Sequence, residues 1–286
     1  MPRLFERVTI AGVGLIGGSL ALAARRAHLV GEIVGLGRTQ ENLDAALARE
    51  IVDRVTRDTR AAVHDADLVV LAVPVASMAA LAAEMAPALR PGTVVTDVGS
   101  VKTRVVHDVT RALPNGVHFV GAHPIAGTEE SGAAAARVDL FRGTRCVLTP
   151  TADTDATAQA KVRALWEGVG ARVEALPPEQ HDEVLAWVSH LPHALAFSAV
   201  NALLDVDAAF AQFAGPSFRD LTRVAASSTE MWCDIFLANG APLDHVIAQF
   251  IARLDTLRQA IATGERAKLA EQLTRARAAR RQWSVS

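Results

Sequence analysis

The sequence predicts a two-domain α/β protein, with a doubly wound parallel sheet over residues 1–177 and an all-helical domain over residues 178–286. Three observations lead to this fold class. Short β-branched runs alternate with alanine-rich segments of helical spacing in the first part, a glycine motif joins the first run to the first helix, and no strand pattern returns after Pro177–Pro178.

The predicted strands are short apolar runs, most of them separated by helix-prone segments. In chain order they are VTIAG (8–12), EIVGL (32–36), DLVVLAVP (67–74), TVVTDVG (93–99), HFVGA (118–122) and RCVLT (145–149). This alternation favours parallel strands that are covered by helices on both faces. From Glu179 onward only helical spacing is found, and it is interrupted at Gly215–Pro216, Gly240 and Gly264.

Composition excludes several classes of protein. With 286 residues, of which 50% are hydrophobic, the chain is long enough to bury a sizeable core, and its net charge of -2 gives no general attraction to nucleic acid or anionic lipid. Cys146 and Cys233 lack CxxC spacing, so neither a disulfide framework nor a zinc site is expected. The N-terminus enters a strand pattern at once, and the apolar stretch Leu191–Leu204 is shorter than the roughly 20 residues of a membrane span. We therefore expect a cytoplasmic protein that contacts neither nucleic acid nor membrane.

The glycine motif predicts a dinucleotide site. Gly12, Gly14 and Gly17 form GxGxxG between the first predicted strand and the first predicted helix, with Leu15 and Ile16 inside the motif. The three glycines permit a tight turn, close approach of the backbone to a pyrophosphate, and close packing of helix on strand, and the helix N-terminus donates N–H groups to the phosphates. The alternative is a glycine-rich packing turn. In this context the motif favours a Rossmann-type domain.

The end of the second predicted strand bears on which nicotinamide cofactor is bound. A site that prefers NAD usually has an acidic residue there, whereas this chain has Gly37, Arg38 and Thr39. Arg38 and Thr39 are suited to hold a 2′-phosphate, which favours NADP. Alternatively, Arg38 stacks on the adenine and tolerates either cofactor.

The run Gly121–Gly132, GAHPIAGTEESG, predicts a reaction site. It places His123 among glycines, close to Thr128 and Glu129, in a loop that follows an apolar run. We expect the imidazole at the mouth of a strand, where small residues let a ligand approach the backbone. Taken alone, a single histidine is more often structural, so a catalytic role for His123 depends on motifs elsewhere in the chain.

Seven motifs, in family order over nearly the whole chain, resemble those of the prephenate and arogenate (cyclohexadienyl) dehydrogenases. They are GVGLIGGSLA (12–21), AVP (72–74), DVGSVK (97–102), HPIAGTEESG (123–132), SHLPHA (189–194), FRDLTR (218–223) and MW (231–232). The resemblance implies oxidative decarboxylation of a cyclohexadienol, with hydride transfer to NAD or NADP, in tyrosine biosynthesis. It also implies a helical domain that forms most of a homodimer, a site between the two domains, and a place for Val73 and Pro74 at the cofactor.

The same resemblance implies roles for individual residues. His123 accepts the proton of the ring hydroxyl as the carbonyl develops, and Ser100 bonds the same hydroxyl and the nicotinamide side. Ser100 has an alternative role as the N-cap of a helix that begins near Val101, and both roles are compatible. Arg223 clamps the ring carboxylate.

Further substrate contacts come from the loop and from the helical domain. Arg219 stands where relatives often have a lysine that reaches into the neighbouring subunit, and without the resemblance it would be a solvated helix residue. The turn GPSF (215–218) departs from the glycine-rich turn expected in relatives, which puts the shape around the substrate side chain in doubt. The substrate contacts implied are His193, Arg219, Thr128, Glu129 and Trp232, the last as an apolar wall.

The sequence gives less support to other functions. Hydroxyacid and imine dehydrogenases usually depend on a lysine in the helical domain, but the lysines here are Lys102, Lys161 and Lys268, all outside Val184–Leu237. A regulator that senses nucleotide without chemistry would not need the implied catalytic set. His190 and His193 are separated by Pro192 without a third ligand nearby, so no metal is expected. Of the two substrates, prephenate is favoured because Arg219 suits a keto acid flanked by carboxylates.

Overall fold

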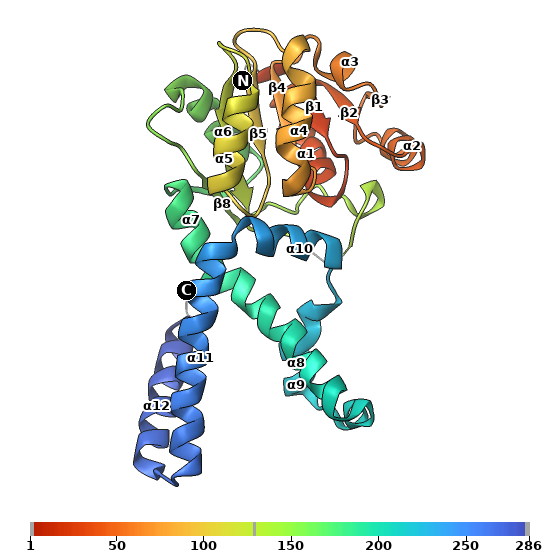
Figure 1. The fold of residues 1–286 in the computed structure, drawn as a ribbon. Helices are drawn as coiled ribbons and strands as arrows, with labels where there is room; N and C mark the ends of the chain where they lie inside the picture. The colour runs from red at the N-terminus through yellow and green to blue at the C-terminus, as the bar shows by residue number, and fades with distance from the viewer. Residues whose placement is uncertain (1–2, 128–129, 284–286) are drawn as a thin grey trace. The chain divides into compact units, whose positions relative to one another are not determined.

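The computed structural model describes residues 3–127 and 130–283, which form two compact units, Met1–Asn239 and Gly240–Ser286. The first unit contains a six-stranded parallel sheet in the order β3-β2-β1-β4-β5-β6 (Figure 1). Its strands are β1 (Phe5–Ala11), β2 (Val30–Leu36), β3 (Arg54–Thr56), β4 (Leu68–Leu71), β5 (Val94–Asp97) and β6 (His118–Val120). The predicted fold class is confirmed, and the short edge strand β3 was not expected.

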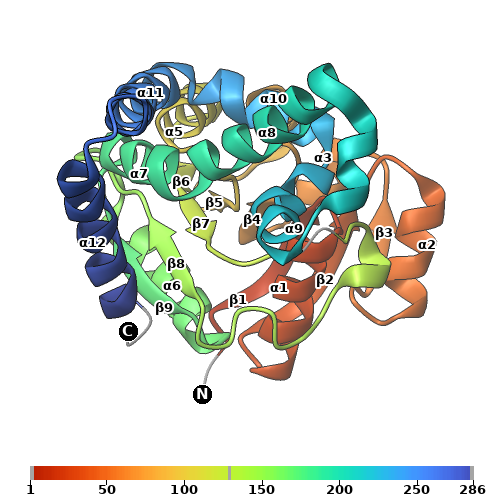
Figure 2. The ribbon, with the colours of Figure 1, turned by 90° about the horizontal axis from the view of Figure 1, so that it is seen from below.

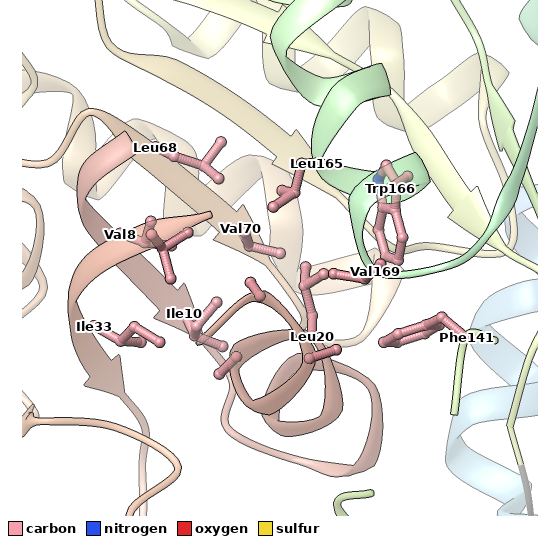
Figure 3. Packing of buried hydrophobic residues seen from close by; sticks show 14 of the residues in the cluster. Val8, Ile10, Leu20, Ile33, Leu68, Val70, Phe141, Leu165, Trp166 and Val169 are labelled. Carbon is pink, nitrogen blue, oxygen red and sulfur yellow. The ribbon is translucent and has the colours of Figure 1, made fainter. Parts of the chain in front are cut away.

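Helices cover both faces of this sheet. Alternate residues of β4 show why, since Leu68 and Val70 belong to one hydrophobic cluster while Val69 and Leu71 belong to a second. The first cluster includes residues of α1 and α6, and the second includes residues of α3, α4 and α5. Figure 3 shows the first cluster, in which Phe141 meets Trp166 edge to face. The helices are α1 (Leu15–Arg26), α2 (Gln40–Ala48), α3 (Thr59–Val63), α4 (Val75–Met85), α5 (Thr103–Ala112) and α6 (Ala156–Gly168).

A second, three-stranded sheet lies beside α6 (Figure 2). It consists of β7 (Ala122–Pro124), β8 (Arg145–Leu148) and β9 (Arg172–Ala175), with β7 antiparallel and β9 parallel to β8. Two expectations are corrected here. The run RCVLT joins this sheet instead of the main one, and His123 lies within the short strand β7 instead of in a loop at a strand mouth. The physical reason is Gly121, whose carbonyl accepts from Thr149 N at 2.9 Å and so starts the pairing of β7 with β8.

Among the described residues, every element after Ala175 is helical, as predicted. The first unit continues with α7 (Pro178–Leu185), the π-helical turn η3 (Ala186–His190), α8 (Leu191–Asp207), η4 (Ala208–Phe213), α9 (Pro216–Thr222), η5 (Arg223–Ala226) and α10 (Thr229–Ala238). The second unit is a pair of contacting helices, α11 (Gly240–Ala262) and α12 (Arg266–Trp283), joined at the left-handed Gly264. The predicted breaks at Gly215–Pro216, Gly240 and Gly264 all coincide with helix ends.

The helical run Pro178–Phe213 is longer than its sequence indicated. By length and composition alone it could cross a membrane, and only 6% of its most apolar window is buried. Helices α10 and α11 pass the same test only when they are counted together. The expectation that the apolar stretch Leu191–Leu204 is too short to span a membrane is therefore wrong about the length of the helix. The helix is longer because η3 continues α7 into α8 without a break. An apolar helix face of this kind is covered either by lipid or by another protein surface.

We predict that Gly17→Ala lowers the melting temperature by several degrees. A Cβ at Gly17 would lie 2.3 Å from the carbonyl oxygen of Gly12, a backbone atom that cannot move aside, so crowding of about 1–3 kcal/mol outweighs the helix propensity gained. The matched control is Gly14→Ala, where nothing lies within 4 Å of the added atom. Thermal unfolding followed by circular dichroism measures both. Equal melting temperatures would contradict this account of the packing of α1.

Candidate functional site

The glycine motif lies where the order of the strands reverses. Strands β1 and β4 are neighbours in the sheet, yet β1 continues into α1 and β4 into α4. Ala72 N donates to Ala11 O at 2.7 Å, so the two strands stay together to their carboxyl ends. Gly12 turns there with a φ of +97°, and a Cβ on it would lie 2.3 Å from Ala72 O. Ligands of doubly wound sheets bind at this kind of reversal point.

The space above the motif fits a pyrophosphate. Nothing lies within 4 Å of the position that a Cβ on Gly14 would take, and Gly14 is the N-cap of α1 without a side chain to cap it. The first turn of α1 carries no acidic residue, so its N–H groups and its dipole favour an anion. Leu15 is buried in the core and Ile16 is partly buried, which leaves their backbone N–H groups for the phosphates.

The remaining predicted cofactor residues surround this turn. Val73 lies against it, with Cγ1 3.1 Å from the Cβ position of Gly12, and Pro74 is the N-cap of α4. Arg38 and Thr39 are exposed just beyond the carboxyl end of β2, where Thr39 is the N-cap of α2. The structure thus brings the predicted cofactor residues to one edge of the sheet.

His123 is buried and hydrogen-bonded to a second histidine that the sequence analysis did not single out. Its Nδ1 lies 2.9 Å from Nε2 of His181, and the two rings meet edge to face with centroids 5.1 Å apart. His181 Nδ1 in turn lies 2.8 Å from Oδ1 of Asp182. His181 and Asp182 belong to α7, so this chain of hydrogen bonds joins the helical segment to β7.

Burial and neighbouring charges keep His123 neutral. Burial, together with the nearby His181 and Lys102, holds the pKa of His123 well below its ordinary value of 6.5. Burial alone would raise the pKa of Asp182, but hydrogen bonds from His181 and from backbone N–H groups outweigh it and lower that pKa. The site therefore combines a neutral imidazole with a carboxylate two hydrogen bonds away.

A buried ion pair fixes the backbone beside His123. The Lys102 ammonium donates to the carboxylate of Asp97 and, at 2.8 Å, to the carbonyl of Ala122. Ala122 N donates to Asp97 Oδ1 at 3.0 Å. Burial lowers the pKa of Lys102, and the Asp97 carboxylate opposes that shift. Both backbone polar groups of Ala122 are thus held, and they place the next residue, His123.

The capping role considered for Ser100 is wrong. Helix α5 begins at Thr103 with Lys102 as its N-cap, and the N–H groups of Lys102 and Thr103 each donate at 2.8 Å to the carboxylate of Asp182. A carboxylate from a distant helix therefore does what a local hydroxyl was expected to do. Ser100 is partly buried, two residues before this cap, and its predicted contact with the ring hydroxyl stays a prediction.

His193 and Trp232 form one wall. Their rings stack with centroids 3.6 Å apart at an interplanar angle of 23°, and Trp232 packs in a small cluster with Val101 and Ile235. His193 Nδ1 lies 2.9 Å from the carbonyl oxygen of Ser189, which only accepts, so the ring donates from Nδ1 and Nε2 is left as an acceptor. Burial lowers the pKa of His193, as does the charge of Arg223.

Other predicted residues are placed less closely. Arg223 is exposed, at the start of η5, and Arg219 is exposed on α9 with Nε donating to Ala214 O at 3.1 Å. Thr128 and Glu129 lie outside the described residues, so their predicted contacts stay predictions.

The two histidines considered for a metal have different hydrogen-bond partners. His190 Nδ1 lies 2.9 Å from Asn239 Nδ2, whereas His193 turns to Trp232 and the carbonyl of Ser189. Within residues 3–127 and 130–283, no group of three or more His, Cys, Asp or Glu side chains could hold a metal ion. That the protein works without a metal stays a prediction.

Two family models cover most of the chain. The model described as "Prephenate dehydrogenase, nucleotide-binding domain" matches residues 20–175, and the one described as "Prephenate dehydrogenase, dimerization domain" matches residues 177–275.

Individual relatives and solved structures agree with these matches. The chain is 40% identical to the cyclohexadienyl dehydrogenase of Zymomonas mobilis over 97% of its own length and 96% of the relative's. It is similar to the prephenate dehydrogenase of Aquifex aeolicus solved with hydroxyphenyl propionate and NAD+, with 36% identity, a TM-score of 0.92, and coverage of 97% and 98% of the two chains. It is also similar to the arogenate dehydrogenase of Synechocystis, with 29% identity, a TM-score of 0.83, and coverage of 97% and 99%. The chain therefore belongs to the prephenate dehydrogenase family.

Proposed function

We propose that the protein catalyses the oxidative decarboxylation of prephenate, with hydride transfer to a nicotinamide nucleotide. The observation that carries this proposal is the neutral, buried His123 in β7. This strand follows the carboxyl end of β6, which belongs to the sheet whose carboxyl edge also carries the pyrophosphate cradle. The segment after His123 passes the start of α1, since a Cβ on Gly127 would lie 4.0 Å from Ile16 Cδ1. A proton acceptor and a hydride acceptor would thus flank one substrate.

The chain's own residues account for the proton. When bound, a nicotinamide nucleotide would supply the acceptor for the hydride that leaves the carbinol carbon of the ring. His123 takes the hydroxyl proton as the carbonyl forms, and returns it to the phenolic oxygen when loss of carbon dioxide makes the ring aromatic. The reaction then needs no net proton from solvent. A neutral imidazole is the state that this first step requires.

The helical segment supplies the substrate contacts in this proposal. Arg223 would hold the ring carboxylate with the fork of its guanidinium. Its place near the substrate is supported by the effect of its charge on His193, whose ring stacks on Trp232. His193 Nε2 and the Trp232 ring would line the substrate, and Ser100 would orient the hydroxyl. Thr128 and Glu129 complete the proposed set by sequence alone, and Glu129 would read the side chain that distinguishes prephenate from arogenate.

We place the functional domain boundary between residues 177 and 178. The family matches support a boundary close to this point, since the first ends at residue 175 and the second begins at residue 177. The dimerization domain matched there supports a homodimer, and a second copy of the chain would cover the exposed apolar side chains of α8 and η4, such as Val206 and Phe213. A dimer covered in this way needs no membrane, in keeping with a cytoplasmic location.

We predict that His123→Ala lowers kcat by about a hundredfold or more, because a positioned general base contributes typically 10²–10⁴-fold. Steady-state rates of formation of reduced nicotinamide measure this. His107→Ala, which removes an exposed imidazole from α5, is the control and should keep the normal rate. Near-normal turnover of His123→Ala would contradict the role of His123 as the general base.

Arg223→Ala should mainly raise KM, because removing one partner of a desolvated charge pair costs on the order of 2–5 kcal/mol. The same kinetic assay gives KM and kcat separately. Arg223→Lys keeps the charge without the bidentate fork, so its KM should fall between those of the wild type and Arg223→Ala. A KM within a factor of two of the wild type in Arg223→Ala would mean that another residue holds the carboxylate.

Arg219 is proposed to act across the dimer. If it does, mixing Arg219→Ala subunits with His123→Ala subunits should restore activity, because each hybrid dimer assembles one complete site. Subunit exchange is checked by native mass spectrometry, and the recovered rate is compared with that of each variant alone. Exchange without any recovered activity would place Arg219 in its own subunit's site or outside it.

Cofactor and substrate preference are tested together by assaying prephenate and arogenate, each with NAD and NADP. We propose NADP, because Arg38 and Thr39 stand exposed at the end of β2 without an acidic neighbour in the loop, and prephenate, because Arg219 suits a keto acid. Arg38→Ala should lower kcat/KM with NADP much more than with NAD. A kcat/KM tenfold higher with NAD, or a clear preference for arogenate, would overturn the corresponding choice.

A further inference from the structure

We propose that His181 and Asp182 are positioning residues that hold His123 in the tautomer with its proton on Nδ1, which leaves Nε2 free to take up the substrate proton. The inference rests on the proposed function for the identity of the substrate. Its structural part depends on the hydrogen bonds of the His123, His181 and Asp182 side chains and on the neutral state of His181.

The carboxylate of Asp182 is the fixed end of this chain of hydrogen bonds. Oδ1 of Asp182 accepts from Lys102 N and Oδ2 accepts from Thr103 N, each at 2.8 Å, so this group is bound as an acceptor on both oxygens. His181 Nδ1 lies 2.8 Å from Oδ1 and must therefore carry the proton of that hydrogen bond.

The next hydrogen bond follows from the first. Burial lowers the pKa of His181, and the carboxylate of Asp182 opposes that shift without reversing it, so the ring is neutral near pH 7. With its single proton on Nδ1, His181 presents a lone pair at Nε2. His123 Nδ1, 2.9 Å away, must then be the donor, and its Nε2 is left unprotonated.

Other ionisable groups around the pair do not disturb this order. Lys102 and His190 are the further groups that act on His123, and Lys102 and Asp97 are the further groups that act on His181. Burial lowers the pKa of His190 to about 4, so it is neutral, and the Lys102 ammonium is bound to Asp97 and the Ala122 carbonyl. The opposed charges of Lys102 and Asp97 lie side by side, which leaves Asp182 as the anion at the end of the chain.

Asp182 also fixes the backbone. By capping α5 it holds the segment that leads from Ser100 into that helix, and Lys102 within this cap ties down Ala122, the neighbour of His123. One carboxylate thus sets the orientation of the imidazole and anchors the strand end that carries it. A role limited to anchoring would lower stability, whereas the proposed role also sets the proton affinity of His123.

The first experiment measures the pH dependence of kcat/KM in Asp182→Asn. When His123 takes up a proton, the imidazolium is stabilised by the lone pair of His181 and, through it, by the negative charge of Asp182. Replacing that charge with an amide lowers the pKa of His123, so the acidic limb of the profile should move to lower pH while kcat falls about 10- to 100-fold. Glu183→Gln, the same change at the exposed neighbouring position, should leave limb, kcat and melting temperature unchanged.

His181 offers a conservative pair of variants. His181→Phe keeps a ring but removes both hydrogen bonds, and should lower kcat with KM changed by less than about threefold. His181→Gln should recover part of kcat, because an amide oxygen can accept from His123 while the amide N–H donates to Asp182. The proposal would be overturned if His181→Phe and His181→Gln lost kcat equally, kept the acidic limb of the pH profile of kcat/KM in place and had lowered melting temperatures. His181 and Asp182 would then have a structural role alone.

The tautomer of His123 can also be measured by NMR in the absence of substrate. In ¹⁵N-histidine-labelled enzyme, correlations between ring nitrogens and carbon-bound protons distinguish Nδ1–H from Nε2–H, and the His123 signals are assigned by their loss in His123→Ala. The proposal requires the Nδ1–H form in the wild type and a mixture of tautomers in His181→Phe. The Nε2–H form in the wild type would overturn it. An enzyme with the required tautomer that fails to oxidise prephenate would instead count against the proposed function alone.

Discussion

The carboxylate of Asp182 is the group on which the rest of the site depends. It is almost fully buried, and a buried charge costs several kcal/mol unless hydrogen bonds replace its lost hydration. Here the replacement comes from two backbone N–H groups at the start of α5 and from the ring of His181. Because the acceptor belongs to α7 and the backbone donors to the sheet domain, the interaction ties the helical segment to the edge of the sheet at which the ligand is expected.

The geometry of the site follows from this constraint and from the topology of the sheet. Parallel strands bring the Gly12 turn, the loop before α5 and the end of β6 to one edge, while β7 departs from that edge to carry His123. The buried Lys102 and Asp97 hold the residue next to His123 by both of its backbone polar groups. What remains adjustable is the ring itself, and only His181 reaches Nδ1 among the hydrogen bonds found in the described part of the chain. A positioned imidazole, rather than a freely rotating one, is what proton transfer requires.

Much of this could be predicted from the sequence, for local reasons. The β-branched runs and the GxGxxG motif encode their structure within a few residues, so the main sheet apart from its short edge strand β3, the first helix and the helical second half could be predicted. Strands β7 and β9 were missed because their partners lie far away, and no local pattern records that pairing. His181 and Asp182 were missed for a related reason: a polar HDE triplet on a helix has the composition of a solvated face, and only the fold brings it to a histidine 58 residues earlier. Ser100 is a natural cap candidate in the sequence because it lies just before the helix. The carboxylate that does cap α5 belongs to Asp182, 79 residues beyond Thr103, and no local pattern records it.

The most direct test of the account is a double-mutant cycle on kcat between His123 and Asp182. If Asp182 contributes to the chemistry through the imidazole, then Asp182→Asn should cost about 10- to 100-fold in the wild type and close to nothing in a His123→Ala background. The melting temperatures of the four proteins separate this coupling from loss of fold. A full and equal loss of kcat in both backgrounds would show that Asp182 acts independently of His123, and would contradict the central claim.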